Sequence, residues 1–443
     1  MGVVRVRLVI ALALCAGPLC GSGLRAGAAK SVITPDLSRF HPVYMAGFGQ
    51  NRVATGVHDP LYARCIAIET GARPLAVCAL DLVGLFYDDV RKVREAVPEA
   101  DVVVASTHTH EGPDTMGLWG PERGKSGINE DYNALVVRRT AETARAAVRT
   151  MQPAAAALAS VRSPELDSFI DDNRPPQVHD SELIVLQLRT AAGKPIATAV
   201  NWANHPETLG SKNTLITADY PAALYAELER RMGGVAALWN GAVGGMQSPL
   251  GAKLARLADG TFEKAEAIGR RVAELAAGAT AKKAAITRVD FRESMVNIPV
   301  ANAGFRMAQQ VGLFGGRRKD TGAETAVPVG YVRMAAGGRP LLEIALAPGE
   351  VYPELSVGGV ERYAGADFPE APVEPALKSL MRAPYRMLIG LANDEIGYII
   401  PKAEWDEKAP YLRDAKKAWY GEVNSMGPET AGRIAAAFAA LAR

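Results

Sequence analysis

The 443-residue chain has almost no net charge, few cysteines and no long apolar run, and each of these features excludes a class of protein. Its 50 basic and 48 acidic residues are scattered, which gives no support for nucleic-acid binding. No apolar run reaches the ~20 residues of a membrane-spanning helix. The paired CxxC motifs of a structural zinc module are missing. With 48% hydrophobic and 22% charged residues, the composition is that of a folded globular protein.

Residues 1–29 are predicted to be a signal peptide. A basic start, a short apolar stretch and small residues at 26–28 follow one another in the order typical of such leaders. Residues 30–443 are then expected to form a single catalytic domain, exported to the periplasm or secreted. Residues 305–326 are rich in glycine and contain three consecutive basic residues, so we predict a mobile surface loop there.

Two of the four cysteines, Cys15 and Cys20, lie in this leader, and Cys65 and Cys78 remain. The remaining pair lies on two apolar runs joined by a short turn, so a hairpin would place the two side chains nearly opposite each other. Export permits a disulfide. The favoured interpretation is nevertheless two small buried thiols on strands.

Apolar runs of strand length alternate with longer helical stretches, a pattern that indicates an α/β protein. Most of six such runs lack polar alternation and are predicted to be strands buried on both faces: 75–82, 101–105, 196–203, 235–239, 341–346 and 387–392. Four segments have helical patterns: 130–151, 219–232, 262–279 and 428–442. We therefore expect a mixed, largely buried β-sheet core flanked by helices.

Polar side chains follow these strands at the point where each one ends. The strand over 101–105 runs into Ser106-Thr107-His108-Thr109-His110, and the strand over 196–203 is followed by Asn204-His205-Pro206-Glu207. The other strand ends lead to Asp81, Ser248, Glu350 and Tyr398. In open α/β sheets, ligands gather outside the carboxyl ends of the strands. We therefore expect an active site at that edge.

Histidine is rare, and three of the six in the chain lie at these strand ends. His108 and His110 are two residues apart, so in an extended segment both imidazoles face the same way. Zinc binds imidazole nitrogen and carboxylate oxygen, and its catalytic sites keep one position open for water. His108, His205 and one carboxylate would make such a set. The alternative for each histidine is a structural hydrogen-bonding role.

Several common hydrolase motifs are missing. There is no GxSxG elbow, which disfavours an ordinary α/β-hydrolase. There is no HExxH motif, which disfavours a zincin. The glycines at 47–49 and 244–245 lack the lysine and the spacing of a phosphate-binding loop and are interpreted as tight turns.

Taken in order, these segments resemble the neutral/alkaline (non-lysosomal) ceramidase family, whose members are zinc amidases that cleave the N-acyl bond of ceramide. The resemblance is sharpest at Ser106-Thr107-His108-Thr109-His110-Glu111-Gly112-Pro113 and at Asn204-His205-Pro206. It extends to Pro348-Gly349-Glu350 and to the region of Tyr398, and it covers most of the mature chain.

The resemblance implies one Zn²⁺ and a role for each matching residue. The metal ligands would be His108, His205, Glu350 and Tyr398. His110 would lie beside the metal or contact the polar group of the substrate. Ser248, which precedes a proline, occupies the place of a serine that the family carries at its active site.

Three features depart from the family pattern. Met246 stands where an acidic residue is usual and Leu250 where asparagine is usual, on either side of Ser248. Glu111 stands where serine is common. The chain also ends some 45 residues after Tyr398, which leaves no room for the immunoglobulin-like C-terminal domain of well-studied ceramidases.

The resulting hypothesis is a zinc-dependent hydrolase of the N-acyl bond of ceramide or a ceramide-like lipid, acting through metal-activated water. His110 and Asp81 are candidate proton-handling groups, and Ser248 is a candidate for positioning water or substrate. A small-molecule or lipid N-acyl substrate, with peripheral membrane contact and no nucleic acid, is the expected partner. The alternatives are a zinc amidase or esterase for a soluble acyl compound, and an exported binding protein without catalytic activity.

Overall fold

The computed structural model describes residues 23–172, 174, 176–245, 247–254, 256–318, 323–412 and 415–443. Most of the predicted leader, residues 1–22, lies outside this part of the chain. The predicted boundary at residue 29 falls inside strand β1 (Arg25–Val32), in which Ala26 is fully buried. The fold therefore uses residues from Arg25 onward. Among the described residues, no helix combines the length and the apolar character needed to cross a bilayer.

The larger of two main sheets has nine strands among the described residues. Their spatial order is β10 (Val235–Asn240), β8 (Pro195–Trp202), β7 (Leu183–Thr190), β6 (Gln152–Val161), β1, β3 (Tyr62–Glu69), β4 (Leu75–Leu80) and β5 (Asp101–Ser106), with β11 (Lys282–Ala284) paired to β6. The pairs β4–β5 and β8–β10 are parallel, and the remaining pairs are antiparallel.

The smaller sheet contains β12 (Arg288–Pro299), β13 (Glu324–Ala336), β14 (Arg339–Leu346) and β16 (Tyr385–Ile389) in that order. It packs face to face on the larger sheet, and one apolar cluster contains inward side chains of both. Two short parallel pairs complete the strands: β15 (Glu350–Val351) with β17 (Tyr398–Ile399), and β2 (Gly56–Val57) with β9 (Leu215–Ile216).

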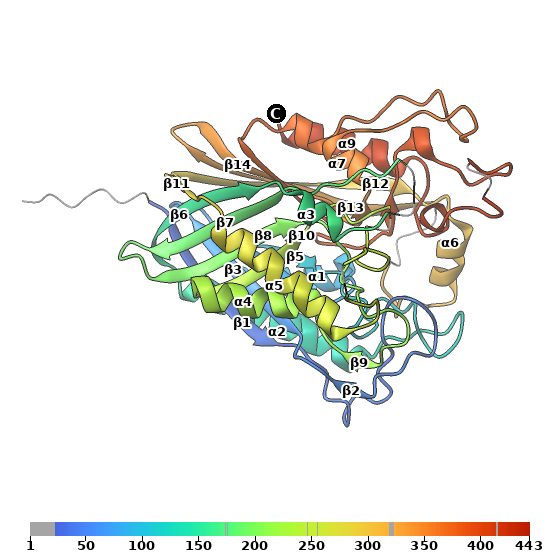
Figure 1. Ribbon diagram of the computed structural model, residues 1–443, viewed down its shortest axis with the longest axis horizontal. Coiled ribbons are helices and arrows are strands. Elements are labelled where there is room, and N and C mark those ends of the chain that lie inside the picture. The colour runs from blue at the N-terminus through green and yellow to red at the C-terminus, as the bar shows by residue number, and fades with distance from the viewer. Residues whose placement is uncertain are drawn as a thin grey trace, which may run out of the picture.

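Helices cover the outer face of each sheet, so the molecule has four layers (Figure 1). The larger sheet is covered by α1 (Tyr87–Glu95), α2 (Glu130–Arg149), α4 (Tyr220–Met232) and α5 (Phe262–Gly278), and the smaller sheet by α9 (Thr430–Leu441). The short helices are α3 (Pro164–Ser168), α6 (Ala303–Gln310), α7 (Pro353–Val357), α8 (Tyr420–Val423), η1 (Leu377–Leu380) and η2 (Lys402–Glu404).

The six predicted strands and four predicted helices are all present, and the predicted α/β class with a buried β core is confirmed. Two of the predicted helices begin at a side-chain cap. Asn129 accepts a hydrogen bond from the Tyr132 amide, and Asp219 accepts one from the Tyr220 amide. The strands are divided between two sheets, a division that strand-length apolar runs do not reveal.

The prediction of two free cysteine thiols is wrong, and the predicted loop at 305–326 has more regular structure than expected, while its mobility stays a prediction. Cys65 and Cys78 form a disulfide, because the antiparallel register of β3 and β4 places them directly opposite each other. The predicted loop at 305–326 begins with most of helix α6, ends with the start of β13 and has an anchored turn between them. In that turn, Arg317 is buried and paired with Asp89 (2.5 Å). Residues 319–322 lie outside the described chain.

The larger sheet curls until its two edge strands, β5 and β10, approach each other. The side chain of Asn240, at the end of β10, joins them there. Its amide nitrogen donates to the carbonyls of Thr107 (2.7 Å) and Asn204 (2.9 Å). These hydrogen bonds connect the segment after β5 to the segment after β8. The two segments carry all three predicted site histidines.

Candidate metal centre

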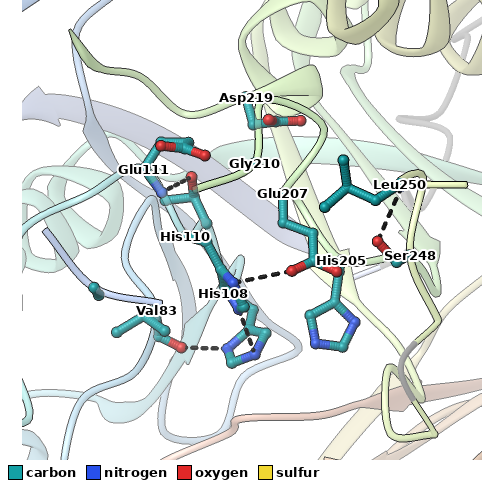
Figure 2. A network of polar contacts seen from close by, with 12 residues as sticks. Val83, His108, His110, Glu111, His205, Glu207, Gly210, Asp219, Ser248 and Leu250 are labelled. Carbon is teal, nitrogen blue, oxygen red and sulfur yellow. Dashed lines mark hydrogen bonds and ion pairs between the residues drawn. The ribbon is translucent and has the colours of Figure 1, made fainter. Parts of the chain in front are cut away.

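The structure brings His108, His110, His205 and Glu350 together from three segments of the chain. The segment after β5 supplies His108 and His110, the segment after β8 supplies His205, and Glu350 begins β15. The ring centroids of the three histidines lie 4.8 to 5.5 Å apart. Figure 2 shows the three rings gathered in one cluster. Ring nitrogens of all three lie within 4.8 Å of one another, close enough to hold one metal ion.

Each of the three imidazoles has an oxygen atom next to its Nδ1. The Nδ1 of His108 lies 2.6 Å from the carbonyl of Val83, and that of His205 lies 2.8 Å from the carbonyl of Gln247. The Nδ1 of His110 lies 3.1 Å from the Glu207 carboxylate. Since carbonyl and carboxylate oxygens can only accept, Nδ1 carries the proton in a neutral ring, and Nε2 keeps its lone pair.

These lone pairs face one another and a carboxylate. The Nε2 atoms of His108 and His110 are 3.4 Å apart. The Oε2 atom of Glu350 is 3.1 Å from Nε2 of His205 and 3.4 Å from Nε2 of His108. Acceptors gathered at this distance need a shared proton or a cation between them. Imidazole nitrogens and a carboxylate oxygen are the donors that zinc takes, so the residues present fit that metal.

The charges in the cluster favour an anionic Glu350. Burial opposes its ionisation, but His108 and His205 outweigh that effect and hold the pKa of Glu350 well below its usual range. Burial also lowers the pKa of His110, to about 4, although Glu207 opposes the change. At neutral pH His110 is therefore uncharged, with its Nε2 lone pair available.

Two unusual backbone positions place the histidines. His108 has φ of +71°, which costs a non-glycine residue roughly 1–2 kcal/mol and is most often found at functional sites. Its amide is fixed by the carbonyl of Leu82 at 2.9 Å. Gly47 has φ of +80°, and a Cβ there would lie 2.6 Å from the His110 ring. Only glycine leaves room for His110 in its observed position.

The cluster lies at the wall of a largely apolar pocket. His108, His110, Glu350, Glu395, Arg318, Tyr398 and Tyr420 contribute polar groups to the lining. Most of the rest is apolar: Val83, Phe86, Met116, Leu118, Trp119, Phe305, Phe314, Ile396 and Met426. Such a pocket suits a ligand with an apolar body and a polar group that reaches the histidines.

Two further predicted site residues lie close to the cluster. Tyr398 is the register partner of Glu350 in the β15–β17 pair and lines the same pocket. Its role as a metal ligand stays a prediction. Ser248 forms a hydrogen bond with Glu207, and its Oγ accepts the amide of Leu250 at 3.0 Å. Ser248 therefore contacts the carboxylate behind His110, which favours positioning over nucleophilic attack.

Glu207 is a site residue that the sequence interpretation did not single out. Burial opposes its ionisation, but contacts with His110 and Ser248 lower its pKa to about 2. It stands two residues after His205, in the same motif at the end of β8. The sequence signal that could have identified it is an acidic residue directly after a histidine-proline pair.

Asp81, by contrast, is not brought to the cluster. Its carboxylate accepts the amide of Tyr62 at 2.9 Å and the hydroxyl of Tyr225, in α4, at 3.2 Å. These contacts direct it toward the helix layer, where Arg64 also lies over the ring of Tyr225. These contacts give Asp81 a structural role, and its part in handling protons during the reaction stays a prediction.

The substitution Asp81→Asn tests this role. Burial raises the pKa of Asp81 from 3.8 to about 7, although Arg64 opposes the change. Between these values the unfolded chain ionises the group while the folded chain keeps it neutral, so stability falls as the pH rises through this range. We expect Asp81→Asn to remove this pH-dependent loss of stability, which is at most about 4 kcal/mol. Denaturant unfolding measured across the same pH range would show the change. An unchanged pH dependence would contradict this role.

The departures from the family pattern have structural counterparts. Glu111 is buried and forms an ion pair with Arg52 at 3.0 Å, so it belongs to the scaffold behind the histidine segment. Leu250 contributes its amide to Ser248. Met246 lies outside the described residues.

Comparisons with solved structures identify the fold. The chain is similar to the neutral ceramidase from Pseudomonas aeruginosa, with a TM-score of 0.68 and 18% identity over 95% of this chain and 74% of that one. A ceramidase complexed with C2 gives a TM-score of 0.69, with the same identity and coverage. Models of known families and the curated proteins give no match. The chain thus has the fold of neutral ceramidase, as the sequence resemblance predicts.

Proposed function

We propose that this protein is a zinc-dependent hydrolase that cleaves the N-acyl bond of ceramide or a ceramide-like lipid. One observation carries the proposal: three imidazole Nε2 atoms and the Glu350 carboxylate converge beside an apolar pocket. The shared fold with neutral ceramidase supports the choice of substrate class. The disulfide between Cys65 and Cys78 supports export to an oxidising compartment.

The residues of the site have two roles, as metal ligands and as a general base. His108, His205 and Glu350 would hold the metal, and the family resemblance adds Tyr398 as a further ligand. When bound, zinc would polarise the substrate carbonyl and lower the pKa of water towards ~7. The Nε2 of His110 accepts the proton of the attacking water and returns it to the leaving amine. Glu207, at Nδ1 of His110, orients the ring and stabilises its charged form.

The pocket lining accounts for the lipid part of the substrate. Phe86, Phe314 and Met116 are buried and form one apolar cluster against the pocket. An acyl chain that leaves water for such a surface gains about 0.8 kcal/mol for each buried CH₂ group. Longer N-acyl chains are therefore expected to bind more tightly than short ones.

Hydrolysis assays with and without a chelator test the proposal. We expect the purified protein to release fatty acid from detergent-solubilised ceramide, to lose this activity on chelation and to regain it with zinc. The variant His205→Ala should be inactive under all three conditions. Activity that survives both chelation and His205→Ala would contradict the proposed chemistry.

The same assay separates the two alternatives. Zinc-dependent activity on short soluble N-acyl compounds, with none on ceramide, would retain the metal chemistry and reject the lipid substrate. A protein without activity and with less than half an equivalent of zinc, unchanged by His108→Ala, would be a binding protein with this fold.

A further inference from the structure

The mouth of the pocket is surrounded by apolar side chains that reach into solvent. Five of them form what we name the mouth patch: Phe48, Met307, Val311, Tyr420 and Val423. Their exposed fractions range from 37% for Phe48 to 65% for Met307. Contiguous exposed apolar groups of this kind mark sites of contact with a protein or a membrane.

Contacts between the segments that carry the mouth patch tie them to one another and to the pocket-lining residues. Asn302, which caps α6, donates to the carbonyl of Val423 in α8 at 3.0 Å. The segment after α6 is also close to the segment that contains Trp119. A Cβ built on Gly117 would lie 2.1 Å from the carbonyl oxygen of Leu313. The side chain of Gln50, in the Phe48 turn, donates to the carbonyl of Leu118 at 3.1 Å.

Helix α6 presents the most exposed part of the mouth patch. Met307 lies within the helix and Val311 is its C-cap residue, and at a spacing of four residues they share one helix face. No side chain of α6 is fully buried. In Figure 1 the helix stands at the margin of the molecule, away from the two sheets. Phe305, in the first turn of the same helix, lines the pocket, so this helix connects the exposed face to the site.

Basic residues lie beside the mouth patch. The segments 120–126 and 415–419 adjoin the pocket-lining residues Trp119 and Tyr420. Their exposed charged residues are four basic ones and a single acid: Arg123, Lys125, Lys416 and Lys417, with Glu122. Positive charge around an exposed apolar surface is the combination that binds anionic lipid membranes.

We propose that the mouth patch docks this protein on an anionic lipid surface, with the exposed Met307 and Val311 entering the interface beside the pocket. The inference rests on the proposed function in one respect, because a lipid substrate must pass this mouth to reach the histidines. A lipid surface is favoured over a second protein because the apolar rim continues into the apolar pocket and has basic residues beside it.

Vesicle sedimentation tests the docking surface without any hydrolysis. The full chain is mixed with ceramide-free vesicles of phosphatidylcholine, with or without a quarter of phosphatidylglycerol. We expect binding to the anionic vesicles, weaker binding to the neutral ones, and a loss of about tenfold or more in affinity for Met307→Ser/Val311→Ser. Because these vesicles contain no substrate, the result stands even if the protein hydrolyses no lipid.

The control variant is Met295→Ser/Val357→Ser. It alters a methionine and a valine that are also exposed, at 45% and 44%, but lie outside the mouth patch. It should bind vesicles as the unaltered protein does, and both variants should turn over a short soluble N-acyl substrate normally. Absent vesicle binding, or equal losses in the two variants, would overturn the proposal. So would a dimer in sedimentation velocity that Met307→Ser/Val311→Ser converts to a monomer, because the patch would then bind a second copy.

Discussion

The substitution Glu350→Gln is expected to lower kcat/KM for N-acyl hydrolysis by more than 100-fold. The carboxylate lies between the Nε2 atoms of His108 and His205, at 3.4 and 3.1 Å, and supplies a negative charge that glutamine lacks. Removing a group that only supports a metal ligand already lowers metal affinity or activity 10- to 100-fold, so removing a ligand itself should lower activity further. Steady-state kinetics, with zinc affinity measured alongside, will show the effect.

Glu354→Gln is the matched control for this substitution. Glu354 is also buried and lies four residues further along the chain, but it pairs with Arg174 at 2.9 Å, outside the histidine cluster. We expect this variant to lose stability while keeping the turnover of each folded molecule within a few-fold of normal. Equal losses of activity in both variants would assign Glu350 a structural role only.

Replacing Asn240 by alanine is expected to damage both the fold and the metal centre. The buried side chain donates to the carbonyls of Thr107 and Asn204 and accepts the amides of Asn204 and Gly241. Each buried backbone group left without a partner costs about 1–3 kcal/mol. We therefore expect Asn240→Ala to lower the free energy of unfolding by roughly 3 kcal/mol and to weaken zinc binding 10- to 100-fold.

Asn201→Ala separates these two effects. Asn201 is equally buried and donates to two carbonyls, those of Trp239 and Leu388, at 2.7 Å each. Both bonds lie within the strand layers, away from the segments that carry the histidines. Denaturant unfolding should show a comparable loss of stability, while zinc titration should show near-normal affinity. Zinc binding that weakens equally in both variants would contradict the bridging role of Asn240.

The sequence predicts the elements well because their patterns are local. The stretches 75–80 and 102–105 are uninterrupted apolar runs, and the helix from Glu130 has both a cap and a clear apolar face. The residues that follow each strand are equally local. His108 and His205 could therefore be chosen without knowing how the strands pair, whereas the family resemblance singled out Glu350 among the carboxylates.

The curl of the larger sheet could not be predicted, because it depends on contacts between distant segments. β5 and β10 are at opposite edges of the strand order, yet they approach each other at the site. Glu207 was missed for the same reason, because its contact with His110 joins segments 97 positions apart. The cysteine pair shows the reverse: the hairpin and the nearly opposite placement of Cys65 and Cys78 were foreseen, but the disulfide between them was not favoured.

Metal analysis of the purified protein is the most direct test of the central claim, that His108, His205 and Glu350 form a zinc site with His110 beside it. We expect one zinc ion per chain after purification without added metal. We also expect little zinc in His205→Ala, with the variant still folded by circular dichroism. A folded protein without zinc that gains none on titration, or a His205→Ala variant that keeps the full amount, would contradict the account.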